Sequence, residues 1–283
     1  QQKTNDILEV RVQERTLALA QLNNEYTQSV TYASYIQASL LPSISLIKER
    51  LNDSFILYNP RDIVSGDFYW YADVQTSTTP HVGLQVLCAV DCTGHGVPGA
   101  FMSLVANNLL DLTVKQESVN TPSDVIAFLN KNLAKAMNKE HSEQVINDGM
   151  DIIVCSYQPT TKTLYYAGAN RPLYLVKHST LELIEIKAVK MSIGGYTPLT
   201  QEWETTTLQL ESGDCYYLSS DGYADQFGGE KDKKITTKRL KQLLVQIHPL
   251  TMQEQQQALQ NYFTTWQGDQ KQIDDVMLIG VRV

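Results

Sequence analysis

Hydrophobic residues recur at helical spacing along residues 1–41, a stretch that contains neither glycine nor proline. From Asn5 to Leu40, eight of the eleven core positions of a heptad repeat are apolar: Leu8, Val12, Leu19, Leu22, Tyr26, Ala33, Ile36 and Leu40. Such a stripe is buried most simply against a partner helix in a parallel two-stranded coiled coil, although it can also pack on its own domain. We therefore predict a long helix that ends before Pro42 and joins two copies of the chain into a homodimer.

Beyond Pro42 the pattern changes to short runs rich in Val, Ile, Tyr, Leu and Thr, which are typical of β-strands. The predicted strands are 54–59, 67–74, 82–91, 150–157, 163–168, 172–177, 181–186, 205–210, 214–220 and 275–283. Several are separated by turns of hairpin length, such as residues 159–162 and 177–180. Strands joined by hairpins form antiparallel sheets, so the sequence predicts antiparallel pairing.

Helical patterns interrupt the strands at residues 97–115, 122–140, 236–247 and 251–266. The second of these has a typical N-terminal signature, with Thr121 before it, Pro122 in its first turn and Asp124 close behind. The sequence therefore predicts an α+β fold, in which helices cover the outer faces of antiparallel sheets. We expect one domain over residues 42–283, preceded by a linker helix over residues 1–41.

The composition is that of an ordinary globular protein with an acidic balance. The 283 residues carry a formal net charge of −8, and 42% of them are hydrophobic. Nucleic acids and anionic membranes are bound by basic surfaces, so this balance argues against both as partners. No run approaches the roughly 20 apolar residues of a membrane-spanning helix, and the N-terminus does not resemble a signal peptide.

The chain begins with Gln1, and we expect it to be a fragment of a longer protein. We predict a cytoplasmic location for this fragment, with any membrane anchor in a region that precedes it. The four cysteines are scattered through apolar runs without a CxxC pair: Cys88, Cys92, Cys155 and Cys215. This pattern predicts reduced cysteines in the core, and neither a disulfide framework nor a zinc site.

Four aspartates stand at the ends of predicted strands, beside glycines or other turn residues: Asp67, Asp91, Asp221 and Asp274. A single aspartate of this kind is common in turns, but four at matching positions favour a shared role. If the first hairpin pairs Val74 with Leu84, it also pairs Asp67 with Asp91. Two carboxylates that meet in this way repel one another, and a bound divalent cation removes the repulsion. Oxygen ligands suit Mg²⁺ or Mn²⁺, so the pattern predicts a metal site that acts on a phosphorylated substrate.

Two other kinds of site compete with this interpretation. Residues 94–99 fit the GxGxxG pattern of dinucleotide-binding loops, between a predicted strand and a predicted helix. However, Asp91 would bring a negative charge close to the pyrophosphate, and Pro98 would stiffen the loop. A nucleophilic hydrolase is also disfavoured, because the chain has no GxSxG elbow and no evident third group to orient a Cys92–His95 pair.

Five segments, in order along the chain, resemble the motifs of SpoIIE/RsbU-type serine phosphatases, which belong to the metal-dependent, protein phosphatase 2C-like superfamily. They are DIVSGDFYWY, AVDCTGHGVPGAFMS, AGANRPLYLV, YYLSSDGYADQFGG and DDVMLIGV. The resemblance covers roughly residues 35–283. The earlier segment ILEVRVQERTLALAQLNNEY resembles the coiled-coil linkers that join sensory modules to such output domains.

This resemblance implies a four-layer α-β-β-α sandwich of two antiparallel sheets that binds two Mn²⁺ or Mg²⁺ ions. It implies that a metal-activated water hydrolyses phosphoserine or phosphothreonine on a protein partner, which in family members is typically an anti-sigma-factor antagonist. By position, Asp91 would bridge the two metals, with the Cys92 carbonyl as a candidate backbone ligand. Asp67 would serve one metal, and Asp221 and Asp274 would serve the other.

Contacts to the substrate are less well defined by the resemblance. Arg61 and Arg171 are weak candidates for binding phosphate, because an arginine at such a position is more often structural or solvated. His95 is offset by several residues from the histidine of the eukaryotic branch, which argues against a general-acid role. A catalytically inactive protein-interaction module is the main alternative function, but such a module usually lacks one of the four aspartates. We further expect the N-terminal helix to transmit a change in dimer geometry to the region of Asp67 and Asp91.

Overall fold

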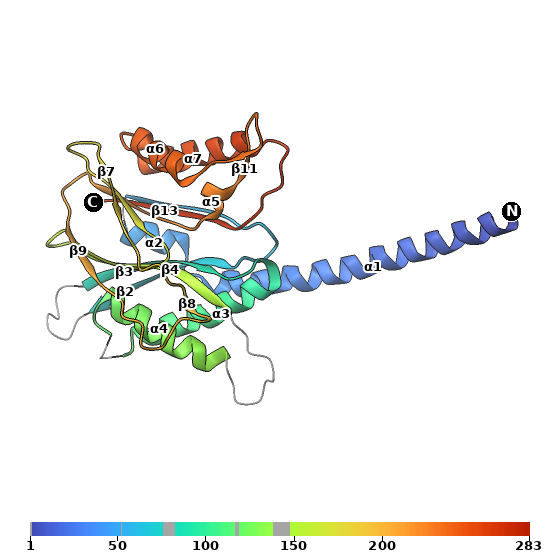
Figure 1. Cartoon of the computed structure of the whole chain (residues 1–283), viewed down its shortest axis with the longest axis horizontal. Coiled ribbons are helices and arrows are strands. Elements are labelled where there is room, and N and C mark those ends of the chain that lie inside the picture. Colours follow the sequence, from blue (N-terminus) through green and yellow to red (C-terminus); the bar gives the residue numbers. More distant parts are fainter. Residues whose placement is uncertain (1, 52, 76–82, 117–118, 138–147) are drawn as a thin grey trace.

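The computed structural model describes residues 2–51, 53–75, 83–116, 119–137 and 148–283. Residues 1, 82 and 138–140, which belong to predicted helices or strands, lie outside the described residues. Two antiparallel sheets are stacked face to face, and a pair of helices covers the outer face of each (Figure 1). The predicted α+β fold and its four layers are therefore confirmed.

The first sheet contains five strands in the order β1-β13-β10-β6-β7. Its strands are β1 (Ser54–Asn59), β6 (Leu173–Val176), β7 (Leu183–Ile186), β10 (Cys215–Ser219) and β13 (Val276–Arg282). The C-terminal strand β13 lies between β1 and β10 and pairs antiparallel with both. Strands from the beginning, middle and end of the domain therefore become neighbours in this sheet.

The second sheet has the strand order β2-β3-β4-β5-β9, and a short strand β8 pairs with β4. Its strands are β2 (Asp67–Gln75), β3 (Gly83–Cys92), β4 (Gly149–Gln158), β5 (Thr163–Ala169), β8 (Ile193–Gly194) and β9 (Thr206–Gln209). In the β2–β3 hairpin Val74 pairs with Leu84 and Asp67 pairs with Asp91, which confirms the predicted register.

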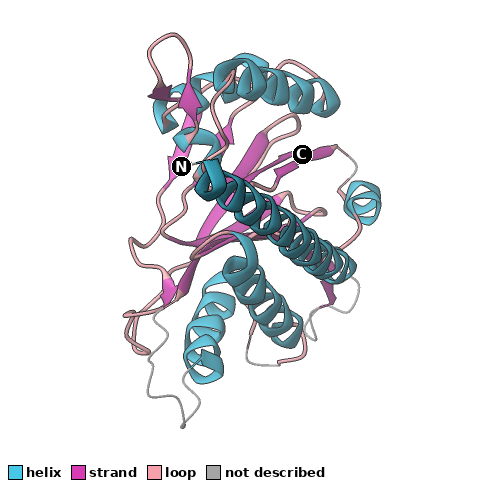
Figure 2. Cartoon of the chain, turned by 90° about the vertical axis from the view of Figure 1, so that its right-hand side faces the viewer, coloured by secondary structure: helices cyan, strands magenta, loops and turns pink. Residues whose placement is uncertain are grey.

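Helices α3 (Gly96–Thr113) and α4 (Pro122–Met137) cover the second sheet, and α6 (Thr237–Ile247) and α7 (Met252–Gln267) cover the first. Figure 2 shows these layers on opposite sides of the strands. Helix α7 begins with a capping box between Thr251 and Glu254, which satisfies backbone N–H groups at its start. The patterns did not predict the short helices α2 (Ile44–Arg50) and α5 (Gly222–Asp225) or the small hairpin of β11 (Phe227–Gly228) and β12 (Lys233–Lys234).

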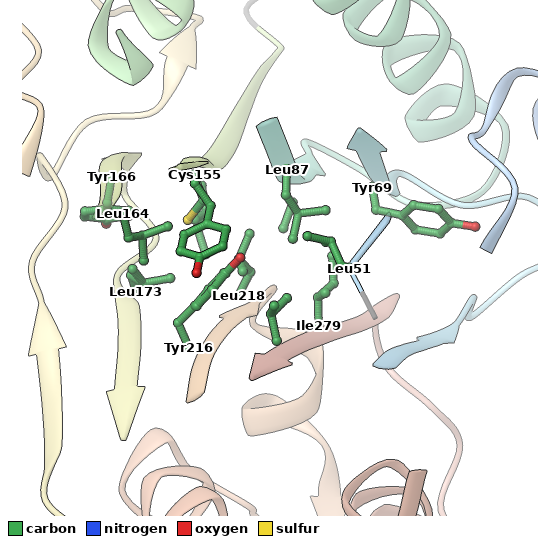
Figure 3. Close-up of a cluster of buried hydrophobic side chains, with 14 of the residues drawn as sticks. Leu51, Tyr69, Leu87, Cys155, Leu164, Tyr166, Leu173, Tyr216, Leu218 and Ile279 are labelled. Atoms are coloured by element: carbon green, nitrogen blue, oxygen red, sulfur yellow. The ribbon is translucent and has the colours of Figure 1, made fainter. Parts of the chain in front are cut away.

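The apolar core between the two sheets is built from alternate residues of the buried strands. In β4, Ile153 and Cys155 face the other sheet, whereas Ile152 and Val154 pack under helices α3 and α4. Figure 3 shows the core between the sheets, with Tyr216 beside Cys155. All four cysteines are buried and unpaired, as the sequence predicted. Because β4 is apolar on both faces, it forms the centre of the fold.

Helix α1 (Gln2–Leu40) confirms the predicted N-terminal helix and extends away from the sandwich (Figure 1). Near its C-terminal end, Val30 packs with Val64 and Ala100, and Gln37 is buried. The apolar stripe nearer its start has side chains that are 54–66% exposed, namely Leu8, Val12, Leu19, Leu22 and Tyr26. None of the helices in the described ranges has the length and apolar character needed to cross a membrane. The coiled-coil homodimer remains a prediction.

Candidate functional site

Three aspartates lie side by side on neighbouring strands at one end of the second sheet. Asp67 at the start of β2 pairs with Asp91 near the end of β3, and Asp91 pairs on its other side with Asp151 in β4. Directly opposed like charges destabilise an antiparallel sheet. These three positions are therefore poor choices for stability alone, which indicates that the carboxylates serve a function.

Two further aspartates lie at the same end of the sandwich, beside strands of the first sheet. Asp221 follows β10, and Asp274 lies just before β13. Together with Asp91 and Asp151 they line a pocket of about 390 Å³. The remaining lining residues come from the β3–α3 loop, from Arg171 and from Ser192. The pocket thus lies where the corresponding ends of both sheets meet, which explains how aspartates more than one hundred residues apart in the sequence come together.

The guanidinium of Arg171 lies among these carboxylates. Its Nη2 donates to Asp91 Oδ2 at 2.7 Å and to Asp221 Oδ2 at 2.6 Å, and its Nε lies 3.1 Å from Asp151 Oδ2. Burial lowers the pKa of Arg171, but the three carboxylates outweigh burial and raise it. The backbone turn that places Arg171 here has Asn170 in the left-handed region, with φ of 59°, a conformation that Asn tolerates better than most residues.

Asp67 lies deeper than the pocket lining and is 3% exposed. Its Oδ2 is buried without a hydrogen-bond partner among the described residues. Burial raises the pKa of Asp67 well above its usual range, and the neighbouring Asp91 raises it further. Burial also raises the pKa of Asp91 to about 7, although Arg171 opposes this shift, and it raises the pKa of Asp274. The site therefore holds carboxylates whose ionised forms need additional positive charge.

The loop that leads into Asp67 is held by a residue of the opposite sheet. Asp275 Oδ1 accepts from Arg61 N and its Oδ2 accepts from Gly66 N, both at 2.7 Å. A Cβ at Gly66 would lie 2.5 Å from the carbonyl oxygen of Gly94, so only glycine fits beside the β3–α3 loop. Asp275 is 2% exposed and joins strand β13 to the start of β2. It acts as a positioning residue for Asp67.

The candidates for substrate binding occupy different positions. Arg171 lines the pocket, whereas Arg61 is not part of its lining, and its Nη1 donates to Ile273 O instead. His95 lines the pocket, and its Nδ1 lies 3.1 Å from Asp62 Oδ2. Cys92 lines the pocket beside Asp91. Of the weak candidates, Arg171 and His95 are therefore in the site and Arg61 is beside it.

Sequence reasoning missed Asp151 and the positioning role of Asp275. Asp151 also accepts from Asn170 Nδ2 at 2.8 Å and from Ser192 Oγ at 2.6 Å, so it orders two segments around Arg171. The signal for Asp151 was present, because an aspartate at the start of an otherwise apolar strand is unusual. Its partner strand could not be identified from turn length, since a helical segment separates β3 from β4.

The donor set is chemically suited to a hard divalent cation. The pocket lining offers several carboxylate oxygens with one guanidinium and one imidazole, and the orphaned Oδ2 of Asp67 belongs to the residue paired with Asp91. Across the described ranges, however, no group of three or more His, Cys, Asp or Glu side chains is arranged as a closed metal site. In this arrangement Asp91 and Asp221 both accept hydrogen bonds from Arg171 Nη2.

The family model described as "Stage II sporulation protein E (SpoIIE)" matches residues 83–283 of the chain. No curated protein sequence is a significant match. Among solved structures, the SiaA-PP2C domain of Pseudomonas aeruginosa superposes with a TM-score of 0.78 at 28% sequence identity. That match covers 92% of this chain and 98% of the SiaA domain chain.

Two further structures share the fold at lower sequence identity. The first contains the PP2C phosphatase domain and a regulatory fragment of SpoIIE from Bacillus subtilis. It matches with a TM-score of 0.60 at 16% identity, over 82% of this chain and 63% of that one. RsbX in complex with magnesium matches with a TM-score of 0.54 at 15% identity, over 81% and 94% of the respective chains.

Proposed function

The chain belongs to the SpoIIE family, whose structural relatives are PP2C-type serine phosphatases, and on that premise we propose that it hydrolyses phosphoserine or phosphothreonine on a protein partner. The observation that carries the proposal is that Asp91, Asp221 and Asp274 come from two sheets to one pocket, with Asp67 paired to Asp91 behind it. Four carboxylates gathered in this way would repel a phosphate unless cations were bound among them. An anti-sigma-factor antagonist is one candidate partner.

We assign two divalent cations, Mn²⁺ or Mg²⁺, to this pocket. Asp91 would contact both, Asp67 and the Cys92 carbonyl would complete one site, and Asp221 and Asp274 would hold the other. The magnesium in the RsbX structure supports this choice by analogy. When bound, such ions would activate water and neutralise charge on the phosphoryl oxygens. The orphaned Oδ2 of Asp67 is the atom that gains most from a cation, since it is buried and unpartnered.

Arg171 supplies the fixed positive charge of the pocket. Its ion pairs with Asp91 and Asp221 place the guanidinium at the pocket wall, where it can bind phosphoryl oxygens in a bidentate manner once those carboxylates contact cations. Asp151 Oδ2 lies 3.1 Å from Arg171 Nε and forms an ion pair with the guanidinium. Arg171 is thus proposed to bind substrate, and Asp151 is proposed to position it.

Hydrogen bonds through Ser65 connect the N-terminal helix to Asp67. Gln37 Nε2 donates to Ser65 O at 2.6 Å, and Ser65 N donates back to Gln37 Oε1 at 3.1 Å. Ser65 lies two residues before Asp67, and its Oγ accepts from Asp67 N. These contacts support the hypothesis that a rearrangement of dimeric α1 helices reaches the metal ligands.

One observation favours the alternative of an inactive interaction module. Arg171 already pairs with Asp91 and Asp221, and the described residues form no closed ligand group. An inactive module would keep this ion-pair arrangement permanently. The two functions therefore differ in whether Mn²⁺ binds and changes the protein.

The test is Mn²⁺-dependent release of phosphate from an aryl phosphate and from a phosphoserine peptide. We expect activity in the wild-type chain and loss of activity in Asp91→Asn and Asp221→Asn. Asp73→Asn is the matched control, because Asp73 lies in the same strand as Asp67 but pairs with Arg50, away from the pocket lining. Absence of wild-type activity, together with no binding of Mn²⁺ by calorimetry, would leave the interaction module as the better description.

A further inference from the structure

A second and larger groove is formed by the part of the chain that follows Asp221 and α5. It has a volume of about 1300 Å³ and is formed by the β11–β12 hairpin against helices α6 and α7. Figure 1 shows β11 and α5 together beside the α6–α7 layer. This volume exceeds the range of about 300–1000 Å³ that is typical of small-molecule pockets, so the groove is large enough for a segment of another polypeptide.

The groove is basic although the chain as a whole is acidic. Five cationic side chains line it, against two acidic ones, Glu230 and Asp232. The cations are Lys231, Lys233, Lys234, Lys238 and Arg239. In the described part of the chain, three of these lysines have no ion-pair partner, namely Lys231, Lys233 and Lys238; Lys234 pairs with Asp225 at 2.8 Å. Unpaired cations gathered on one surface create a field that attracts anions.

An aromatic platform fixes part of this charge in place. The guanidinium of Arg239 lies 4.3 Å from the ring centroid of Trp266, and Tyr262 stacks on the same indole at 6.0 Å. The Trp266 Nε1 donates to Lys233 O at 3.0 Å, which ties the platform to the hairpin. The fork of Arg239 is therefore held in one place before any ligand binds, which favours recognition of carboxylates.

The groove is connected to the pocket through helix α5. Asp221 immediately precedes α5, and Asp225 at the end of the helix pairs with Lys234. The backbone after the hairpin also binds α5, since Thr236 N donates to Ala224 O at 2.7 Å. Four residues of helix rise about 6 Å, so the groove begins within a few residues of extended chain from the phosphate site.

We propose that this groove docks an acidic segment of the phosphoprotein substrate, next to the phosphorylated residue that enters the pocket. The proposal rests on the proposed phosphatase function. Charge complementarity favours an acidic peptide, and the aromatic and aliphatic parts of the lining suit apolar side chains beside its carboxylates. The net charge of −8 on the whole chain disfavours a long polyanion or an anionic membrane, which would also face the acidic remainder of the surface.

The experiment compares two phosphoserine peptides that differ only in a flanking run of glutamates or glutamines. The groove variant is Lys231→Glu combined with Lys238→Glu. Both side chains lack an ion-pair partner among the described residues, and a glutamate in the first turn of α6 is compatible with the helix dipole. The control combines Lys48→Glu with Lys115→Glu, which makes the same charge change away from the groove lining.

We expect the groove variant to lower kcat/KM for the glutamate peptide by about tenfold, mainly through KM, because two favourable pairings become repulsive. Its activity on the glutamine peptide and on an aryl phosphate should stay within about twofold of wild type. The control should not distinguish the two peptides. Equal kcat/KM for both peptides in the wild type, or an equal loss for both in the groove variant, would overturn the proposal.

Binding of a fluorescent glutamate peptide without phosphoserine separates this proposal from the phosphatase assignment, because that measurement needs no catalysis. Anisotropy should show salt-sensitive binding to the wild type and about tenfold weaker binding to the groove variant. Loss of phosphatase activity with this binding intact would refute the function but not the docking groove. Tighter binding of a DNA oligonucleotide or of phosphatidylserine vesicles than of the peptide would refute the choice of an acidic protein segment.

Discussion

Replacing Gln37 with alanine tests whether helix α1 holds the loop that carries Asp67. Gln37 is 6% exposed and makes three hydrogen bonds, two of them with the backbone of Ser65 and one with Ser103 Oγ at 2.8 Å. In Gln37→Ala, Ser103 keeps its bond to Ala100 O, but the buried N–H and C=O of Ser65 lose their partners. Each buried group left without a partner costs about 1–3 kcal/mol.

Two such groups should lower the free energy of unfolding by about 3 kcal/mol. Alanine has a better helix propensity than glutamine, but this offsets only a few tenths of a kcal/mol. The measurement is urea-induced unfolding followed by circular dichroism, with Mn²⁺-dependent hydrolysis of an aryl phosphate as the second readout. We expect activity to fall together with stability, because Ser65 Oγ binds the backbone of Asp67.

Gln28→Ala is the matched control, since Gln28 lies in the same helix but is exposed. It should leave both the unfolding midpoint and the activity at wild-type values. An unfolding midpoint in Gln37→Ala equal to that of Gln28→Ala would refute the reasoning. It would mean that the loop before Asp67 holds its position without the helix.

Three further predictions concern the metal site, acid stability and the helix. Mn²⁺ at about one hundred times its Kd should raise the Tm of the wild type by roughly 5–10 °C and leave Asp91→Asn unchanged, as measured by scanning calorimetry; an equal rise in both would exclude Asp91 as a ligand. Burial tends to raise the pKa of Asp214, but hydrogen bonds from Lys177 Nζ and from two backbone amides lower it below 3.8 on balance. This ion pair therefore stabilises the fold above about pH 4 and loses its effect as the pH falls through the folded-state pKa, so acid titration should destabilise the wild type more steeply than Asp214→Asn. Deleting residues 1–28 should convert a dimer to a monomer in sedimentation experiments, and a full chain that is already monomeric at micromolar concentration would contradict the coiled-coil prediction.

The predictable part of the fold came from local patterns. The predicted hairpin of β2 and β3, with Val74 opposite Leu84, is a local feature, and a shift of one residue would move every side chain to the other face. That register alone placed Asp67 opposite Asp91, and the structure has the same pairing. The short helix α2 was missed since seven residues are too few to show a helical period.

The predicted site was incomplete because its other members depend on contacts between distant segments. Asp151 reaches Asp91 through the pairing of β3 with β4, and helices α3 and α4 lie between these strands in the sequence. The sequence showed Asp274 and Asp275 side by side, but only the packing of β13 against the loop before β2 distinguishes their roles. Asp275 binds Arg61 N and Gly66 N, whereas Asp274 lines the pocket.

By itself the sequence determined the α+β class, the long helix and the aspartates at strand ends, since each depends on residues that are close together along the chain. The tertiary structure decided that Arg171 rather than Arg61 lies among the carboxylates, that Gln37 joins the helix to Asp67, and that scattered lysines share one groove with Trp266. Each of these contacts joins residues from different sheets, helices or loops. Side chains from separate elements become neighbours through burial of apolar surface, which leaves no local signal in the sequence.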